Sequence, residues 1–325
     1  MSQEPTTAGL LGIHALTPLH PGAGTALGTV DLPVQRERHT HWPNIAGSAL
    51  KGILRDACRE LVKKDHNGDR TKANEAEVIT TLFGPPQGSS QDAAAAGAVS
   101  ITDARLLAFP VRSLKGVFAW VTCPAVMERF ARDCKLAGLT ASNASALKPN
   151  DALSAMIPSN CPCKVGEQGK TQYLLLEEFK LDVVTGDPTA WAEWVASRLL
   201  PTSAEYQDTI TRFDRQLVVV HDDDFSHFVK YATEVTARIG LDYETKTVKG
   251  GALFYQEFLP TETLLYSVLI VNSARARGEQ KSAATLMPDL AKRIADIPNS
   301  VLQIGGDETT GKGYCSVRLT TGGAK

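Results

Sequence analysis

The chain has 325 residues, of which 43% are hydrophobic and 22% charged, as expected for one large globular domain or two modest ones. Its net charge of −2 excludes a uniformly basic nucleic-acid binder. Aromatic residues make up only 6%, which argues against a broad platform for stacking bases. A nucleic-acid site on this chain would therefore need locally concentrated positive charge, or RNA shared with partner subunits.

The sequence also predicts a cytoplasmic protein. The first residues are polar and no apolar run reaches the length of a membrane span, so we expect neither a secretory signal nor membrane association. Six cysteines are then expected to be reduced. Cys161 and Cys163 form a C-P-C pair that could be half of a zinc site. Because no second pair stands at a matching distance, two loop thiols are the favoured interpretation.

The N-terminal part predicts a strand, a long loop and a helix. Residues 8–16 are apolar on both alternating faces, which predicts a strand buried on both sides. Residues 17–47 form an unusually long loop, and such loops are usually functional. Apolar residues at helical spacing predict a helix over 49–64, with Ser48 as its N-cap. The polar and Ala/Ser/Gln-rich residues 64–97 are expected to form an exposed loop insertion.

The rest of the chain mixes strands and helices without a repeating strand–helix period. This pattern favours an α+β fold, with an antiparallel sheet covered by helices on one face, over a doubly wound parallel sheet. We expect helices over 124–137, 189–200, 203–214, 223–236 and 281–296, and strands over 98–110, 117–122, 173–184, 216–220, 236–243, 252–258, 263–272, 301–304 and 314–320.

The loop between the first strand and the first helix combines glycines with basic residues. Gly22, Gly24 and Gly28 allow the backbone to approach a ligand closely. The amides that open the helix at Ser48, together with the helix dipole, would favour an anion. These features indicate phosphate binding rather than a plain surface loop. The candidate RNA-binding residues here are Arg36, Arg38, Ser48, Lys51 and Arg55.

A second glycine loop, GGDETTGKG, occupies residues 305–313. It contains most of a nucleotide-binding P-loop, but glycine at 313 replaces the hydroxyl residue that would hold magnesium. A strand is expected after the loop, whereas a P-loop opens a helix. A site for nucleotide hydrolysis is therefore rejected. Two alternatives are then open: a loop that contacts a phosphodiester through Gly305, Gly306, Gly311 and Lys312, or a plain hairpin turn.

Three residues are candidates for the chemistry. Asp31 lies between the glycines and the arginines, where a carboxylate could accept a proton from a 2′-hydroxyl or hold a hydrated divalent cation. His20 and Glu257 could bind metal, transfer a proton or support structure, and the sequence leaves these roles open. The run His221-Asp-Asp-Asp-Phe225 superficially resembles a metal-binding motif, but its acids more plausibly stabilise a helix N-terminus.

Several sequence blocks together are similar to a known family. They are LTPLHPGAGT at 16–25, GTVDLPVQRERH at 28–39, GSALKG at 47–52, LFGPP at 82–86, FPVRSLKGV at 109–117, GALFYQE at 251–257 and QIGGDETTGKG at 303–313. They resemble the repeated backbone subunits of type III-B CRISPR effectors, the Cmr complexes, within the RAMP superfamily.

The resemblance implies one domain over 1–325 with a modified RRM-like, ferredoxin-like palm, inserted helical elements and a β-hairpin thumb. The thumb is expected at about 150–184. In this family, copies stack head to tail along a guide RNA together with other Cmr subunits, and thumbs unstack the guide–target duplex at regular intervals. Target RNA is then cut in a reaction dependent on a divalent metal ion, Mg²⁺ or Mn²⁺. The family's catalytic aspartate corresponds to Asp31, which is also the candidate metal ligand.

Two functions from different classes follow. The first is an endoribonuclease subunit that becomes competent only with neighbouring copies, guide and distorted target in place. The second is a non-catalytic scaffold that binds guide RNA while other subunits cut. Replacement of Asp31 by asparagine in an assembled complex discriminates between them.

Overall fold

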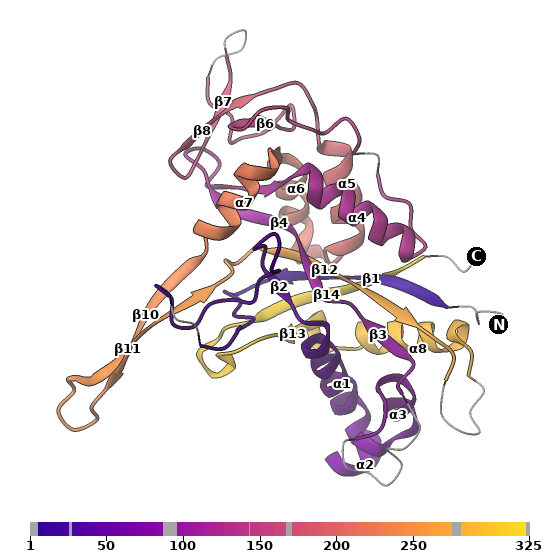
Figure 1. The fold of residues 1–325 in the computed structure, drawn as a ribbon. Helices are drawn as coiled ribbons and strands as arrows, with labels where there is room; N and C mark the ends of the chain where they lie inside the picture. Colours follow the sequence, from indigo (N-terminus) through magenta and orange to yellow (C-terminus); the bar gives the residue numbers. More distant parts are fainter. Residues whose placement is uncertain are drawn as a thin grey trace.

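The computed structural model describes residues 6–25, 28–86, 96–142, 144–166, 171–274 and 281–322. Within them, one twelve-stranded sheet forms the centre of the molecule and a two-stranded ribbon projects from it (Figure 1). The strands of the sheet are β1 (Thr7–Ala15), β2 (Asn44–Ile45), β3 (Val99–Ile101), β4 (Ala104–Arg112), β5 (Phe118–Thr122), β6 (Ser154–Met156), β7 (Tyr173–Leu176), β8 (Phe179–Val183), β9 (Leu217–Val220), β12 (Leu264–Val271), β13 (Val301–Gln303) and β14 (Tyr314–Thr321).

The strands of the sheet follow the order β13-β14-β1-β12-β4-β5-β9-β6-β8-β7, with β2 beside β4 and β3 beside β12. Most neighbours are antiparallel, but β5 pairs with β9 and β6 pairs with β8 in parallel. The α+β class predicted from the sequence is confirmed, although the expected antiparallel sheet is a mixed one with two parallel pairs.

The first strand lies in the interior of the sheet. β1 pairs with β12 from Thr7 opposite Val271 and with β14 from Gly9 opposite Thr321, both antiparallel. Every residue from Gly9 to Ala15 is buried, which confirms the predicted strand with two covered faces. The last strands of the chain therefore flank the first one.

Helices cover both faces of the sheet, so the prediction of helices on one face is wrong. Figure 1 shows α4, α5 and α6 on one side and α1 and α8 on the other. At Gly12, an added Cβ would lie 2.3 Å from the Leu199 carbonyl oxygen, so only glycine lets α5 approach β1 this closely. The helices are α1 (Gly47–Lys63), α2 (Arg70–Glu75), α3 (Glu77–Phe83), α4 (Pro124–Leu136), α5 (Thr189–Leu199), α6 (Gln207–Gln216), α7 (Asp222–Tyr231) and α8 (Ala283–Ala295).

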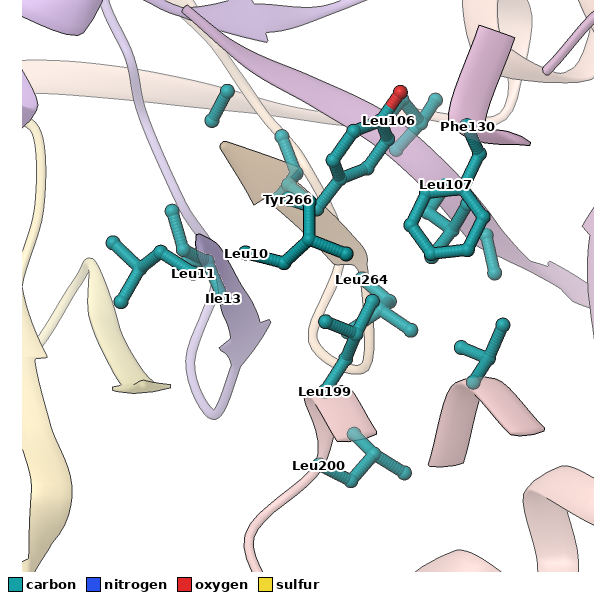
Figure 2. Packing of buried hydrophobic residues seen from close by; sticks show 14 of the residues in the cluster. Leu10, Leu11, Ile13, Leu106, Leu107, Phe130, Leu199, Leu200, Leu264 and Tyr266 are labelled. Carbon is teal, nitrogen blue, oxygen red and sulfur yellow. The ribbon is translucent and has the colours of Figure 1, made fainter. Parts of the chain in front are cut away.

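The main core lies between the central strands and the helices above them. Leu10 of β1, Leu264 and Tyr266 of β12, Phe130 of α4 and Leu199 of α5 pack together with almost no exposed surface (Figure 2). Apolar burial on this scale is the dominant favourable contribution to folding. It provides a rigid base for the loops and the ribbon that leave the sheet.

The segment 64–97 differs from its predicted form. It contains α2 and α3, and Ile79, Leu82 and Phe83 of α3 are buried in the core. The segment is therefore partly a packed helical element against α1 and not an exposed loop. Its polar composition concealed the apolar residues that α3 buries. Residues 87–95 of this insertion lie outside the described residues.

The segment 150–184, expected to be the thumb, contains β6, β7 and β8, which extend the large sheet. The projecting ribbon instead comes from β10 (Glu234–Leu241) and β11 (Val248–Phe258). The helix predicted over 223–236 ends at Tyr231, because the chain turns there into β10. No helix in the described part of the chain is long and apolar enough to cross a membrane.

Candidate functional site

Distant segments of the chain meet at the foot of the ribbon, which is the end where Glu234 of β10 pairs with Phe258 of β11. The N-terminal loop runs beside β11, where the Leu32 amide donates to the Tyr255 carbonyl at 3.0 Å and the Glu257 amide donates to the Leu32 carbonyl at 3.0 Å. Leu32 thus forms a parallel bridge with Gln256 and acts as a short third strand. This pairing determines where Asp31, the preceding residue, lies.

Asp31 is exposed and held by one oxygen. Its Oδ2 accepts a hydrogen bond from the backbone amide of Tyr255 at 2.7 Å. Within the described residues, no donor lies within hydrogen-bonding distance of Oδ1. A carboxylate with one oxygen fixed by the backbone and the other open to solvent can accept a proton or bind a cation in a defined direction.

His20 lies beside the same strand, β11, and is only 7% exposed. Its Nδ1 is 2.7 Å from the Glu257 carbonyl oxygen, and its ring packs against Phe258. A carbonyl oxygen can only accept, so Nδ1 carries the hydrogen and Nε2 is the acceptor in the neutral ring. A Cβ at position 22 would lie 2.9 Å from Nε2, so Gly22 keeps this nitrogen accessible.

Glu257 is buried and surrounded by donors. Its Oε1 accepts from Arg36 Nη2 at 2.6 Å and from Thr233 Oγ1 at 2.8 Å, and its Oε2 accepts from the Val34 amide at 2.9 Å. The side chain is 7% exposed. Glu257 therefore belongs to the predicted cluster, but its oxygens are already engaged within the chain.

The two predicted arginines of the N-terminal loop have different surroundings. The Nη1 of Arg36 also donates to the carbonyls of His41 and Val229, so its guanidinium binds three segments of the protein. Arg38 is exposed and has no acceptor within reach among the residues described. Nearby, Arg129 makes two hydrogen bonds to Glu37, at 2.6 and 3.1 Å. The rigid turn leaves the Arg38 cation free to meet an anion.

The C-terminal glycine loop packs against the N-terminal loop. The Gly306 amide donates to the His20 carbonyl at 3.1 Å. A Cβ at Gly305, whose φ is +82°, would lie 2.3 Å from the same oxygen, so a side chain is excluded there. Gly311 at φ +77° has open space around it. The loop leads into β14, which agrees with the rejection of a nucleotide-binding P-loop.

Two cations and one carboxylate, Lys312, Arg238 and Asp307, lie at the foot of the ribbon. Lys312 Nζ lies 5.2 Å and the Arg238 guanidinium 5.5 Å from the centre of the Phe258 ring. Asp307 accepts from Arg238 at 3.0 Å and from Gln256 Nε2 at 2.5 Å. Sequence reasoning missed Arg238, Gln256 and the Tyr255 amide. The sequence of a two-stranded ribbon does not indicate which loops pack beside it.

The basic row on α1 forms a second region and makes contacts within the protein. Lys51 donates to the Val99 carbonyl, and Arg55 donates to the Gly84 carbonyl and to Asn74. Burial lowers the pKa of Arg55, and the charge of Arg59 lowers it further. These cations join α1 to neighbouring elements, a role that helical spacing alone does not indicate.

The predicted N-cap is also displaced on α1. Ser48 is exposed but lies inside the first turn, because the helix begins at Gly47 with Ala46 as its N-cap. The Gly47 amide donates to Asp103 Oδ1 at 2.8 Å, so a carboxylate of the chain already occupies this amide. The Ser48 N-cap prediction is therefore wrong.

The two remaining candidate motifs make contacts within the protein that indicate structural roles. His221 caps α7, and the adjacent Asp222 and Asp224 accept from the backbone amides of Ala125 and Leu153. In the C-P-C pair, Cys161 and Cys163 are both buried, and Cys163 lies against Gln216. The described residues contain no group of three or more His, Cys, Asp or Glu side chains arranged to hold a metal ion.

Comparisons with known proteins identify the family. A model of the RAMP superfamily matches residues 13–316. The chain is 38% identical over 310 residues to the CRISPR system Cmr endoribonuclease Cmr4 of Pyrococcus furiosus, and the match covers 95% of each chain. The chain belongs to the RAMP superfamily, in its Cmr4 family. The resemblance read from the sequence blocks is confirmed.

A further relative and two solved structures are also similar to the chain. The CMR subunit Cmr4 of Saccharolobus solfataricus is 25% identical over 320 residues, with 94% of each chain covered. The crystal structure of oligomeric Cmr4 from Pyrococcus furiosus matches with a TM-score of 0.66 and 29% identity, covering 97% of this chain and 98% of that one. A chain of the type III-B Cmr-beta complex bound to cognate target RNA shares the fold, with a TM-score of 0.64, 20% identity and 96% of each chain covered.

Proposed function

We propose that this Cmr4-family chain is the repeated backbone subunit of a type III-B CRISPR ribonucleoprotein, which binds guide RNA and cuts complementary target RNA. The observation that carries the proposal is Asp31, an exposed carboxylate with one oxygen anchored on the Tyr255 amide and the other open. It belongs to the same N-terminal loop as the glycines and Arg38, and Lys312 lies beside Phe258 of the neighbouring strand β11. The name of the Pyrococcus furiosus relative, an endoribonuclease, supports the same activity.

Cleavage in this proposal is an attack of a target 2′-hydroxyl on the adjacent phosphorus, with departure of the 5′-oxygen. Asp31 Oδ1 would receive the hydroxyl proton or fix the direction of a hydrated cation, while the Tyr255 amide prevents rotation of the carboxylate. Arg38 and Lys312 would stabilise charge on the phosphate. His20 Nε2 is a candidate for proton transfer, because Gly22 leaves it accessible.

A divalent cation, Mg²⁺ or Mn²⁺, fits this site only in part. The chain offers one open carboxylate oxygen at Asp31, and the described residues form no larger cluster of metal ligands. Mg²⁺ commonly binds through one or two carboxylates with water and substrate phosphates completing its shell. When bound, the cation would supply charge for the phosphate. The chain's own contribution is then the position of Asp31.

The thumb is reassigned in this proposal to the ribbon of β10 and β11. The ribbon projects from the body, whereas the strands in 150–184 belong to the sheet. One face of the ribbon carries exposed apolar side chains, including Ile239 opposite Leu253 and Leu241 opposite Val248. Such a face could insert into the guide–target duplex and unstack a step, which would align the 2′-oxygen with the phosphorus beside Asp31.

Backbone contacts to RNA come from both glycine loops in this proposal. The Gly306 amide fixes the C-terminal loop on the His20 carbonyl, and Gly311 is open to a close approach. Ser48 is exposed at the start of α1. Lys51, Arg55 and Arg36 would support RNA binding mainly by fixing the segments that they join. Stacked copies of the chain with other Cmr subunits would sum these contacts along the guide.

The test is Asp31→Asn in an assembled complex with guide and target RNA. Asparagine keeps the shape and can still accept from Tyr255, but it is a poor base and a weak metal ligand. We expect target cleavage to fall by about 100-fold or more, with guide binding and assembly unchanged. The matched control is Asp65→Asn, an exposed aspartate after α1. Cleavage at the wild-type rate would remove Asp31 from the mechanism.

The alternative is a guide-binding scaffold without catalysis. It is favoured by the single open carboxylate and by the absence of a metal-ligand cluster among the described residues. The two functions predict different cut patterns. In a catalytic backbone, the number of target cuts follows the number of copies, and mixing wild-type with Asp31→Asn subunits removes cuts in proportion. A scaffold would leave the pattern unchanged.

A further inference from the structure

Glu257 is, among the described residues, the one buried carboxylate at the foot of the ribbon that accepts hydrogen bonds from three donors, two in the N-terminal loop and one in the connection before β10. It receives the Val34 amide, the Arg36 guanidinium and the Thr233 hydroxyl at 2.6 to 2.9 Å. Only 5% of the residue is exposed. Both oxygens are therefore hydrogen-bonded inside the protein, where an unpaired acceptor or an unpaired arginine would be costly.

Each of the three donors belongs to an element that bears on Asp31 or the ribbon. Val34 follows Asp31 by three residues in the N-terminal loop. Arg36 also donates to the His41 carbonyl in the following turn and to the Val229 carbonyl of α7. Thr233 lies in the connection between α7 and β10. Glu257 itself is in β11, two residues after the amide that holds the Asp31 carboxylate.

The surroundings of Glu257 and Asp31 are opposite in kind. Asp31 is exposed and has an open oxygen, as a group that touches substrate must. Three of the about four acceptor positions of the Glu257 carboxylate are already filled by donors of the chain. Its geometry is that of a residue that holds other residues in place.

We propose that Glu257 is a positioning residue that fixes the Asp31 segment to the foot of the ribbon, in register with an RNA strand held there. This inference rests on the proposed role of Asp31. Displacement of a reacting group by about 1 Å costs on the order of 100-fold in rate. Glu257 therefore acts on the rate through Asp31 and has no contact with RNA or metal.

The experiment measures single-turnover cleavage in assembled complexes with Glu257→Ala, Glu257→Gln and Arg36→Ala subunits. Glu257→Ala should slow cleavage by about 10- to 100-fold, with unchanged target affinity, pH profile and half-saturating Mg²⁺ or Mn²⁺ concentration. Glutamine still accepts from Arg36 and Thr233 but presents an N–H group to the Val34 amide, so Glu257→Gln should restore part of the rate. Glu178→Gln, an exposed glutamate between β7 and β8, is the matched control.

A double-mutant cycle separates positioning from catalysis. If Glu257 works through its link with Arg36, the double variant should be no slower than Glu257→Ala alone. Additive losses, a shifted metal requirement, a shifted pH profile or a Glu257→Gln rate as low as that of Asp31→Asn would overturn the proposal. Loss of the Asp31→Asn effect would instead refute the proposed function, so the two failures are distinguishable.

A milder variant covers the case in which Glu257→Ala does not assemble. Thr233→Val keeps the shape and removes only one donor to Glu257. It should slow cleavage by about threefold, because Glu257 keeps its other two donors, while target affinity and metal requirement stay constant. A wild-type rate for Thr233→Val in an assembled complex would contradict the positioning role.

Discussion

Two antiparallel hairpins of this chain have similar strand patterns and opposite surroundings. The β7–β8 hairpin lies at the edge of the large sheet, where Leu174, Leu176 and Leu181 are fully buried. The β10–β11 ribbon forms a separate two-stranded sheet, and Ile239 and Leu253 on one of its faces are about half exposed. An isolated two-stranded ribbon is at best marginally stable in water.

The difference teaches that apolar side chains in a strand can serve different purposes. In β7 and β8 they add to the core of this chain. In β10 and β11 they form a surface that another molecule can cover, and the foot of the ribbon is held by Leu32, Glu257 and Asp307. Substitutions in the two hairpins should therefore affect different measurements.

The largest expected effect is on stability in the β7–β8 hairpin. Leu181→Ala removes a fully buried side chain and should lower the free energy of unfolding by about 2–5 kcal/mol. Ile239→Ala in the ribbon should change it by about 0.5 kcal/mol or less. Denaturant titration of both variants checks the contrast. Equal losses would show that the ribbon is part of the core after all.

The next effect is on cleavage. Here a change in the ribbon should have a larger effect than a change in the β7–β8 hairpin. Replacing both Ile239 and Leu253 by serine should slow target cutting by about tenfold or more, because the polar face no longer displaces a base pair. Thermal unfolding of the subunit should be almost unchanged. Single-turnover assays provide the measurement, with Lys180→Ser on the exposed side of β8 as the control. Full activity of the double variant would exclude the ribbon as the thumb.

A smaller effect, on RNA binding and stability, distinguishes the lysine at the foot of the ribbon from the basic residues of α1. Lys312→Met should weaken RNA binding severalfold and reduce the salt dependence of binding by about one unit, without loss of stability. Arg55→Ala should weaken guide binding together with stability, since Arg55 joins α1 to Gly84 and Asn74. RNA titrations at several salt concentrations, with melting curves of each subunit, test this. A stable Arg55→Ala variant with weak binding would instead favour direct contact with RNA.

The smallest effect concerns pH at the foot of the ribbon. Burial raises the pKa of Glu234 above its usual 4.5, and Lys312 opposes the shift. The folded state therefore binds a proton more strongly than the unfolded state, so this group favours folding at low pH and the benefit is lost as pH rises through the raised pKa. Glu234→Gln should raise the melting temperature slightly at pH 7 and leave it unchanged near pH 4. An equal gain at both values would contradict the assignment.

Sequence reasoning predicted most of the elements because their apolar periodicity is local. It recovered β1, α4 and β12 closely, and it brought His20, Asp31, Glu257 and the glycine loop into one hypothesis. It could not assign the helical character of 64–97, since short polar helices have no clear period. It could not distinguish the sheet strands within 150–184 from the ribbon strands within 236–258, because their periodicity is alike and only tertiary pairing separates them.

The sequence could not determine the roles of the α1 cations or of Glu257. Whether a lysine or arginine faces a phosphate or its own backbone depends on carbonyls far along the chain, such as Val99 and Gly84. The contrast between an exposed Asp31 and a buried Glu257 likewise depends on the pairing of residues more than 200 positions apart.

The position of β1 between β12 and β14 has a consequence for synthesis of the chain. The first strand has to wait until nearly the whole polypeptide has left the ribosome before its two neighbours exist. Pairing between such distant segments is slow, and it leaves apolar edges open to other nascent chains in the meantime. Because Gly306 binds the His20 carbonyl, the loop that carries Asp31 also acquires its final surroundings last. An incompletely translated chain would consequently be unable to form the proposed cutting site, so we expect newly made subunits to join RNA only after they are finished.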